Sequence, residues 1–365
     1  MYFAIAFLIV SYLLLVISCY TFWLSHKNSN FDEVPEYPAL SILCVGRNEQ
    51  AHLDELLNSV CKINYPGHWE FIYVDDHSSD ETFLKVQPFL SDYISYLKPN
   101  TSVTGKKRCQ ALGVEKSTGD WVLCIDADCS FEPEWPKTMV QFALAHQKMW
   151  VGGVVVQKED SNRSFLNNWQ KVETLFLNII GGVFLSFGLP ILANGANMLF
   201  KKDVFKPMND NQLLNPSGDD VLLTQQVSKM FGKEKLGFCF DSISKVSTDS
   251  PSEWNLFLNQ KIRWASKFKI YSCWEAKLFL VYFSIVQISW VFLFFLELKL
   301  WILLTILKLL IEITTFSHMA KRYQVKQNLL FSLITNVLYP YYSLAIGTMA
   351  RWKGFEWKNR TYLIR

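Results

Sequence analysis

Long apolar runs at both ends of the chain constrain its fold more than any other sequence feature. The first run, Met1–Ser25, contains no charged side chain, and the first positive charge is Lys27. A helix needs about 20 apolar residues to cross a bilayer core, so we expect residues 1–25 to form a transmembrane anchor. A cleaved signal peptide is the alternative, but it would need a basic start and a small-residue cleavage site. The bulky Phe22, Trp23 and Leu24 close this run instead.

Three further apolar runs follow residue 276, and we expect transmembrane or interfacial helices over residues 277–350. The runs are Leu278–Leu296, Leu300–Phe316 and Gln327–Ala350. Lys308 and Glu312 interrupt the second run four residues apart, so they lie on one helix face and can form an ion pair. A shorter apolar stretch at residues 176–192 contains three glycines and a proline. It predicts a core or interfacial helix rather than a span.

The last apolar run also holds Asn336 and Pro340, and a proline inside a helix kinks or breaks it. Basic residues favour the cytoplasmic side of a membrane. The loop with Lys321, Arg322 and Lys326, and the basic tail over residues 351–365, are therefore expected in the cytosol. Three complete C-terminal spans would place the tail outside. We therefore expect one run, the proline-bearing last one, to be re-entrant or interfacial.

Composition excludes several classes of protein. Charged residues make up 19% of the 365 residues, against roughly 25% in soluble domains, and the chain holds 28 Phe and 13 Trp. This hydrophobicity excludes a disordered chain. A formal net charge of +3 leaves no basic footprint for nucleic acid, so no nucleic-acid partner is expected. The 8 cysteines show no CxxC spacing and are expected to be buried thiols in a reducing compartment.

Strand-like and helix-like patterns alternate through residues 35–275, which we expect to form one domain. A 3.6-residue apolar period spans residues 53–60. Short apolar runs that predict strands occupy Ala39–Gly46, Trp69–Val74, Asp120–Ile125 and Trp150–Val156. Such alternation is typical of an α/β fold with a mostly parallel sheet and flanking helices. Ligands bind at the carboxyl ends of the strands in sheets of this kind.

Acidic residues follow two of these predicted strands. Asp75 and Asp76 come after the second strand, and Asp126 and Asp128 come after the third. Four carboxylates on one sheet edge repel one another unless a cation lies among them. Mg²⁺ is bound by a few carboxylates together with phosphate oxygens, so the pattern fits a divalent metal site. A solvated turn is the structural alternative for residues 126–128.

A basic cluster, Gly105–Arg108, precedes the third predicted strand. A lysine beside a metal site would help to neutralise a diphosphate, whereas a solvated basic turn is the alternative. A second motif also has a structural alternative. An apolar run follows Gly218, Asp219 and Asp220, so these residues could form a helix N-terminus, where the helix dipole favours acidic side chains.

Seven motifs together resemble the membrane-associated family 2 glycosyltransferases, which have the GT-A fold and include cellulose, chitin and hyaluronan synthases and ceramide glucosyltransferase. The motifs occur in the family's order at residues 45–49, 74–82, 105–107, 126–128, 193–198, 218–223 and 260–264. The resemblance covers residues 39–268, and the terminal apolar runs also fit it. It implies a Rossmann-like GT-A domain on the cytosolic side of the cell inner membrane or an equivalent membrane.

The resemblance implies a role for each matching residue on the donor side. Asp76, with Asp75 beside it, corresponds to the carboxylate that recognises the uracil end of a UDP-sugar. Lys106 or Lys107 corresponds to the basic position near the nucleotide, and the sequence does not choose between them. The pair of the DxD motif, Asp126 and Asp128, would hold Mg²⁺ or Mn²⁺ on the diphosphate.

The acceptor side follows in the same way from the resemblance. Asp220 corresponds to the general base, with Asp219 before it where many relatives carry Glu. Gln260, Arg263 and Trp264 correspond to the QxxRW motif, which lines the acceptor side, and Arg263 also contacts the diphosphate region. Trp264 as a core or membrane-interface aromatic is the structural alternative.

The chemistry of sugar transfer supports these roles independently of the resemblance. A sugar hydroxyl is a poor nucleophile, so a carboxylate must accept its proton. The departing diphosphate gains charge that a metal ion, a lysine and an arginine can stabilise. We expect an inverting transfer from a UDP-sugar to a lipid or lipid-linked acceptor, because about four membrane segments are few for a polysaccharide channel. The alternatives are a processive polysaccharide synthase with the same chemistry and a non-catalytic membrane scaffold.

Overall fold

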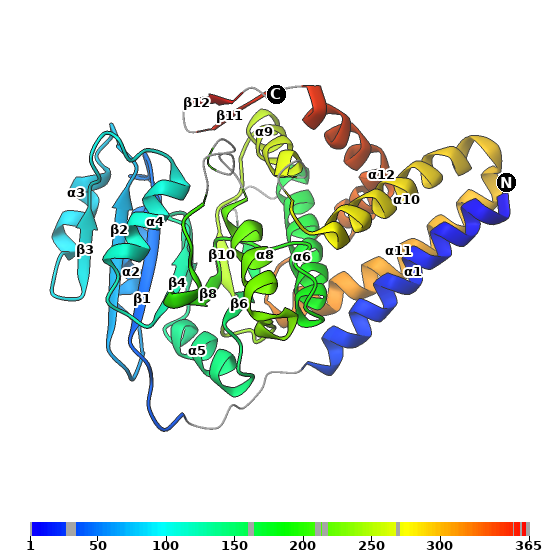
Figure 1. The fold of residues 1–365 in the computed structure, drawn as a ribbon. Coiled ribbons are helices and arrows are strands. Elements are labelled where there is room, and N and C mark those ends of the chain that lie inside the picture. The colour runs from blue at the N-terminus through cyan, green and yellow to red at the C-terminus, as the bar shows by residue number, and fades with distance from the viewer. Residues whose placement is uncertain are drawn as a thin grey trace.

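The computed structural model describes residues 2–26, 34–159, 164–208, 213, 218–267, 271–352, 354–357 and 360–362. Part of the predicted basic tail therefore lies outside the described residues. Lys353, Lys358 and Arg365 are in that part, and Lys27 is also excluded. The rest of the chain forms an α/β body with four long helices on one side of it (Figure 1).

A seven-stranded sheet with the order β3-β2-β1-β4-β8-β6-β9 forms the centre of the body (Figure 1). Strands β3, β2, β1 and β4 run parallel, β8 runs antiparallel to β4 and β6, and β9 runs parallel to β6. The mostly parallel α/β sheet predicted from the sequence is confirmed. The strands are β1 (Leu40–Gly46), β2 (Trp69–Asp75), β3 (Ile94–Leu97), β4 (Trp121–Ile125), β6 (Trp150–Gly153), β8 (Met198–Lys201) and β9 (Leu236–Cys239).

The single strand predicted over Trp150–Val156 is wrong, because the chain changes sheets at Val154. The Val154 carbonyl accepts hydrogen bonds from Val246 N at 2.9 Å and Asn197 Nδ2 at 3.0 Å. The residues beyond it pair away from β6 in a three-stranded sheet. Its strands are β5 (Cys129–Phe131), β7 (Val155–Gln157) and β10 (Val246–Thr248), in the order β5-β10-β7. This small sheet adds a second wall beside the end of β4.

Helices cover both faces of the large sheet, as the alternation along β1 requires. Leu43 packs in one core cluster with residues of α4, α6 and α8, whereas Leu40 and Ile42 pack in another with residues of α2 and α5. The helices are α2 (Leu53–Val60), α3 (Thr82–Val86), α4 (Lys106–Lys116), α5 (Trp135–Ala145), α6 (Phe165–Ser186), α8 (Asp219–Phe231) and α9 (Trp254–Ala265). Six of the eight cysteines are buried, but Cys61 is exposed and Cys273 is half-buried.

Within the described residues, four helices are long and apolar enough to cross a membrane. They pack against one another on one side of the body (Figure 1). They are α1 (Tyr2–Ser25), α10 (Trp274–Leu296), α11 (Leu298–Arg322) and α12 (Leu329–Trp352). Helix α6, which contains most of the predicted core or interfacial stretch, is not among them and packs between the sheet and this bundle. A short hairpin of β11 (Phe355–Trp357) and β12 (Arg360–Tyr362) follows α12.

Pro340 lies inside one continuous helix and does not break it. A proline leaves the carbonyl four residues earlier without its helical donor, which here is the carbonyl of Asn336. The buried Lys308 Nζ donates to that oxygen at 2.8 Å. The same nitrogen lies 2.6 Å from Glu312 Oε2, which confirms the predicted pair. A side chain of α11 thus satisfies the backbone group that Pro340 leaves exposed in α12.

Candidate active site

A cavity of about 660 Å³ opens at the carboxyl ends of β1, β2 and β4. The parallel pairing of these strands places Asp76 and Asp126 at one edge of the sheet, and α6, α8 and α9 form the opposite walls. Nine predicted site residues line it: Asp76, Lys106, Asp126, Asp128, Asp219, Asp220, Gln260, Arg263 and Trp264. The two others, Asp75 and Lys107, do not.

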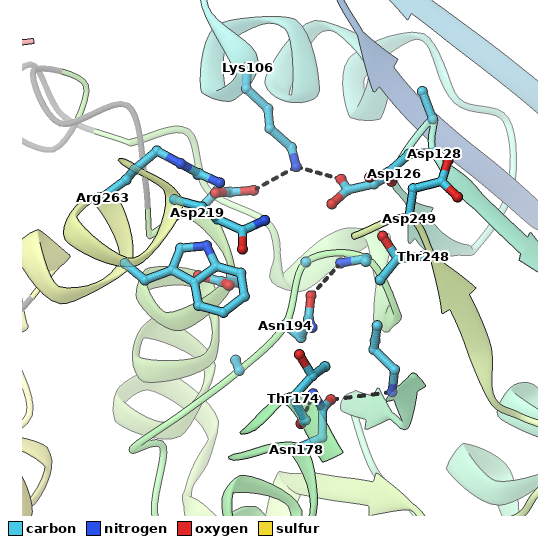
Figure 2. Close-up of a pocket in the computed structure, with 18 of the residues that line it drawn as sticks. Lys106, Asp126, Asp128, Thr174, Asn178, Asn194, Asp219, Thr248, Asp249 and Arg263 are labelled. Carbon is cyan, nitrogen blue, oxygen red and sulfur yellow. Dashed lines mark hydrogen bonds and ion pairs between the residues drawn. The ribbon is translucent and has the colours of Figure 1, made fainter. Parts of the chain in front are cut away.

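Lys106 projects from the first turn of α4 toward carboxylates of two other elements (Figure 2). Its Nζ lies 2.5 Å from Asp126 Oδ1 and 4.0 Å from Asp219 Oδ2. Burial alone would lower the pKa of this lysine, but Asp126 and Asp219 outweigh burial and raise it. Lys106 therefore remains a cation inside the cavity, where it can face a diphosphate.

Gly105 makes the turn that starts α4, with a φ of 90° that favours glycine. Its backbone N–H donates to Asp76 Oδ1 at 2.8 Å. This bond ties the carboxylate at the end of β2 to the start of the lysine helix. Lys107 points instead into the protein, where burial lowers its pKa to about 8. Of the two lysines left open by the sequence, Lys106 is the one that reaches the cavity.

Asp75 and Asp76 are both buried but differ in their contacts. Asp75 accepts hydrogen bonds from Ser78, through its backbone N–H at 3.1 Å and its hydroxyl. It therefore shapes the turn that follows β2, whereas Asp76 lines the cavity.

Asp126 and Asp128 stand at the end of β4 and line the cavity together. Burial and the charge of Asp126 raise the pKa of Asp128, so the pair gains from a nearby cation. Among the described residues, no three His, Cys, Asp or Glu side chains are placed to hold a metal ion. Two carboxylates with open positions for outside oxygens fit a divalent ion that also binds phosphate. The donor set therefore fits Mg²⁺ or Mn²⁺ on a diphosphate.

Asp219 and Asp220 form the first turn of α8, which starts after Gly218 at a φ of 93°. The helix N-terminus predicted as a structural alternative is thus present, and both carboxylates also line the cavity. Both oxygens of Asp220 lie 3.0 Å from Lys267 Nζ. The Asp220 carboxylate is therefore held in one orientation, facing the cavity.

Helix α9 brings Gln260, Arg263 and Trp264 to the wall opposite the metal-site carboxylates. Figure 2 shows the Arg263 side chain extending toward Asp219. Lys261 follows Gln260 on the same helix and is buried. Its Nζ lies 4.0 Å from the centre of the Trp264 ring. The Lys261 cation thus packs on the ring of a residue that lines the cavity.

The sequence did not reveal several other cavity residues. His52 Nδ1 lies 2.7 Å from Asp249 Oδ2, and Lys158 Nζ lies 3.2 Å from the other oxygen of Asp249. Lys267 and Asn194 also line the cavity. Asn194 belongs to a motif that the resemblance includes, but nothing in the sequence indicates its role. The partners of Asp249 are distant in sequence, so no local spacing could have indicated that cluster.

Comparison with known families decides the identity of the central region. Residues 41–207 match the model described as glycosyl transferase family 2. The chain carries a family 2 glycosyltransferase domain. The family predicted from the motifs is thereby confirmed for residues 41–207.

Two curated proteins show how this family 2 domain relates to known enzymes. Poly-beta-1,6-N-acetyl-D-glucosamine synthase of Staphylococcus epidermidis is 26% identical over 198 residues, which are 52% of this chain and 47% of that protein. The chain thus spans about half the length of that relative. Beta-monoglucosyldiacylglycerol synthase of Trichormus variabilis is 29% identical over 138 residues, 37% of this chain and 29% of that protein.

A solved structure resembles the whole chain. The mannosyltransferase PcManGT from Pyrobaculum calidifontis, in complex with GDP-Man and Mn²⁺, has a TM-score of 0.52 at 16% identity and covers 96% of both chains. This likeness supports the fold. The GT-A architecture predicted around the family 2 domain is confirmed.

Proposed function

We propose that this protein transfers a sugar, with inversion, from a UDP-sugar to a lipid or lipid-linked acceptor at a membrane. The observation that carries the proposal is the meeting of Lys106, Asp126, Asp220 and Arg263 in one cavity, from four separate elements. In this proposal residues 35–275 are the cytosolic catalytic domain, and the four long helices anchor it in the membrane.

Asp220 is the general base of the proposed reaction. The acceptor hydroxyl gives its proton to an Asp220 oxygen while its own oxygen bonds to the anomeric carbon, opposite the diphosphate. The bond from that carbon to the diphosphate breaks, and its electron pair leaves with UDP. Lys267 holds both Asp220 oxygens at 3.0 Å. A carboxylate has about four acceptor sites, so the hydroxyl can bind while Lys267 stays in place.

The donor side stabilises the departing diphosphate. Lys106 already lies as a buried cation beside Asp126, and the guanidinium of Arg263 has a fork geometry suited to phosphate oxygens. Mg²⁺ or Mn²⁺ held by Asp126 and Asp128 would neutralise charge on the same group. Mn²⁺ and a sugar nucleotide are both bound in the PcManGT complex, which supports this assignment. Asp76 is proposed to recognise the uracil end, with Asp75 supporting its turn.

Trp264 and Gln260 face the acceptor in this proposal. The indole offers an apolar face to the C–H side of a sugar ring, and Lys261 packs on that indole at 4.0 Å from the ring centre. A processive polysaccharide synthase is a second candidate, because one relative is named as a polymer synthase. Product length on a gel separates the two.

The test is nucleotide release by detergent-solubilised full-length protein with Mn²⁺, a panel of UDP-sugars, and GDP-mannose as the control donor. Crude membrane lipid serves as acceptor, and the Asp220→Asn variant runs in parallel. Release with one UDP-sugar that the variant lacks supports the proposal. Release with GDP-mannose alone contradicts the UDP assignment, and no release with any donor contradicts the transferase assignment.

A further inference from the structure

The cavity has a charged half and an uncharged half. Figure 2 shows Lys106, Asp126, Asp219 and Arg263 around one end and Thr174 and Asn178 at the other, with Asn194 between them. The far end is lined by α6 and β7, and no residue of either element that lines the cavity carries a charge. The proposed function leaves this half without a ligand.

Polar contacts in the uncharged half leave neutral donors available. Thr174 Oγ1 accepts a hydrogen bond from Gln157 Nε2 at 3.1 Å, which leaves its hydroxyl proton to donate. Asn194 Oδ1 accepts from the backbone N–H of Ala196 at 3.0 Å. Within the described part of the chain, no partner occupies Asn194 Nδ2. A hydroxyl group, which both accepts and donates, matches such donors without needing a charge.

The charge balance of the cavity disfavours a second anion. Among the described lining residues, seven are Asp or Glu and four are Lys or Arg. Two of those cations already face carboxylates, Lys106 beside Asp126 at 2.5 Å and Lys267 beside Asp220 at 3.0 Å. A phosphate in the uncharged half would share the cavity with these carboxylates and would have no cation beside it. Its burial would therefore cost free energy.

Helix α6 also connects this half with the candidate membrane helices. Thr174, Asn178 and Gly181 line the cavity at helical spacing. The other side of the helix packs on the bundle, where the rings of Phe176 and Phe316 stack with centres 6.2 Å apart. A single helix therefore separates the uncharged half from α11.

We propose that the uncharged half is the acceptor subsite and that it selects an uncharged, hydroxyl-bearing acceptor over a phosphate-bearing one. This inference rests on the proposed function and deepens it by naming the acceptor class. The hydroxyl belongs to a neutral lipid headgroup or to the end of a neutral saccharide. Thr174 orients the acceptor through its hydroxyl, while Asp220 at the charged end takes the reacting proton.

The experiment compares acceptors with full-length protein in detergent. The donor is the UDP-sugar that gives nucleotide release in the test above, and Mn²⁺ is present. The neutral acceptors are diacylglycerol, monohexosyl-diacylglycerol and a soluble oligosaccharide, and the anionic ones are phosphatidylglycerol and a polyprenyl phosphate. We expect transfer to at least one neutral acceptor at least about tenfold faster than to either anionic one. Partition of labelled product into organic solvent separates the lipid source from the saccharide source.

The Thr174→Val variant removes the hydroxyl at nearly constant volume, and Thr174→Ser keeps it. The valine variant should lower kcat/KM for the neutral acceptor by about fivefold to tenfold, the effect of one hydrogen bond. Donor binding, measured by titration with UDP and Mn²⁺, should not change. Equal activity of the two variants, or faster transfer to a phosphate acceptor, overturns the inference and leaves the proposed function intact. Failure of every acceptor without nucleotide release overturns both.

Discussion

Lys261 Nζ lies 2.9 Å from Glu173 Oε2, and the two side chains are only 4% and 5% exposed. Lys261 is on α9, between the cavity residues Gln260 and Arg263, and Glu173 is on α6. Tyr342 of α12 donates to the other Glu173 oxygen at 3.2 Å. One buried ion pair therefore joins α6 and α9, two walls of the cavity, to the candidate membrane helix α12.

Breaking this pair from one side should destabilise the protein strongly. Lys261→Met leaves Glu173 buried without its cation, which costs about 3–5 kcal/mol in comparable sites. The double variant Lys261→Met, Glu173→Gln should recover much of that loss, because no uncompensated charge remains. Thermal unfolding in detergent measures both. A double variant no more stable than the single one would contradict a coupled pair.

Asp220→Asn should abolish transfer and preserve binding. Removal of the proposed general base lowers turnover by about 10²–10⁴-fold, whereas the proposed contacts to the diphosphate come from Lys106, Arg263 and the metal-site carboxylates and not from Asp220. UDP release and UDP titration with Mn²⁺ separate the two effects. Asp203→Asn, an acid outside the cavity lining, is the matched control. Loss of UDP affinity in the Asp220 variant would place the carboxylate on the donor side instead.

Chelation should remove donor binding. Excess EDTA removes the proposed divalent ion from Asp126 and Asp128, so its charge no longer offsets the repulsion between these carboxylates and the diphosphate. UDP titration should show at least about a tenfold loss of affinity, reversed by Mn²⁺. Asp128→Asn should give the same loss even with Mn²⁺ present. Undiminished binding in EDTA would rule out the metal role of this pair.

The His52–Asp249 pair should give pH-dependent stability. The hydrogen bond to Asp249 raises the pKa of His52 above its ordinary 6.5. A raised folded-state pKa gives a contribution that is complete below pH 6.5 and is lost as the pH rises through the folded value. His52→Gln should therefore lower the melting temperature at pH 6 but not at alkaline pH.

The size of that effect is limited because both side chains are about one-third exposed. We expect less than about 1 kcal/mol. The surface variant His68→Gln serves as the control and should not show the same pH trend. A stability difference that is constant with pH would show that the imidazole contributes by packing and not by charge.

Much of the sheet could be predicted because each of its central strands is a short apolar run that ends in polar residues. That pattern alone predicts that Asp76 and Asp126 lie at one edge of the sheet. The switch of sheets at Val154 could not be predicted, since it depends on a hydrogen bond from Val246, 92 positions later. Valine and glycine continue the strand pattern through this point.

The candidate site, like the sheet, could be predicted from the sequence only in part. Motif spacing identified the nine residues that reach the cavity, but it did not separate Lys106 from Lys107, because adjacent helix residues point in different directions. Lys267, Asp249 and His52 carry no motif of their own. Their positions depend on packing between elements that are far apart in the sequence.

The contact between Lys308 and the Asn336 carbonyl predicts a dependence on Pro340. Lys308→Met should destabilise the protein because the carbonyl loses its donor and Glu312 loses its cation, although Tyr12 still donates to Glu312 Oε1 at 2.7 Å. Pro340→Ala restores a backbone N–H to the carbonyl, so the lysine should matter less in that background. A double-mutant cycle on thermal unfolding measures the coupling. Additive effects of the two substitutions would contradict this role for Lys308.

The same contact has a consequence for how the candidate membrane helices would enter a bilayer. A lone helix α11 would carry Lys308 and Glu312 into lipid, and a lone α12 would expose the carbonyl that Pro340 leaves unbonded. Lys308 of α11 supplies the donor that the α12 carbonyl lacks, and only the six residues 323–328 separate the two helices along the chain. Biogenesis should therefore favour insertion of α11 and α12 together as a hairpin, with neither helix released into lipid alone.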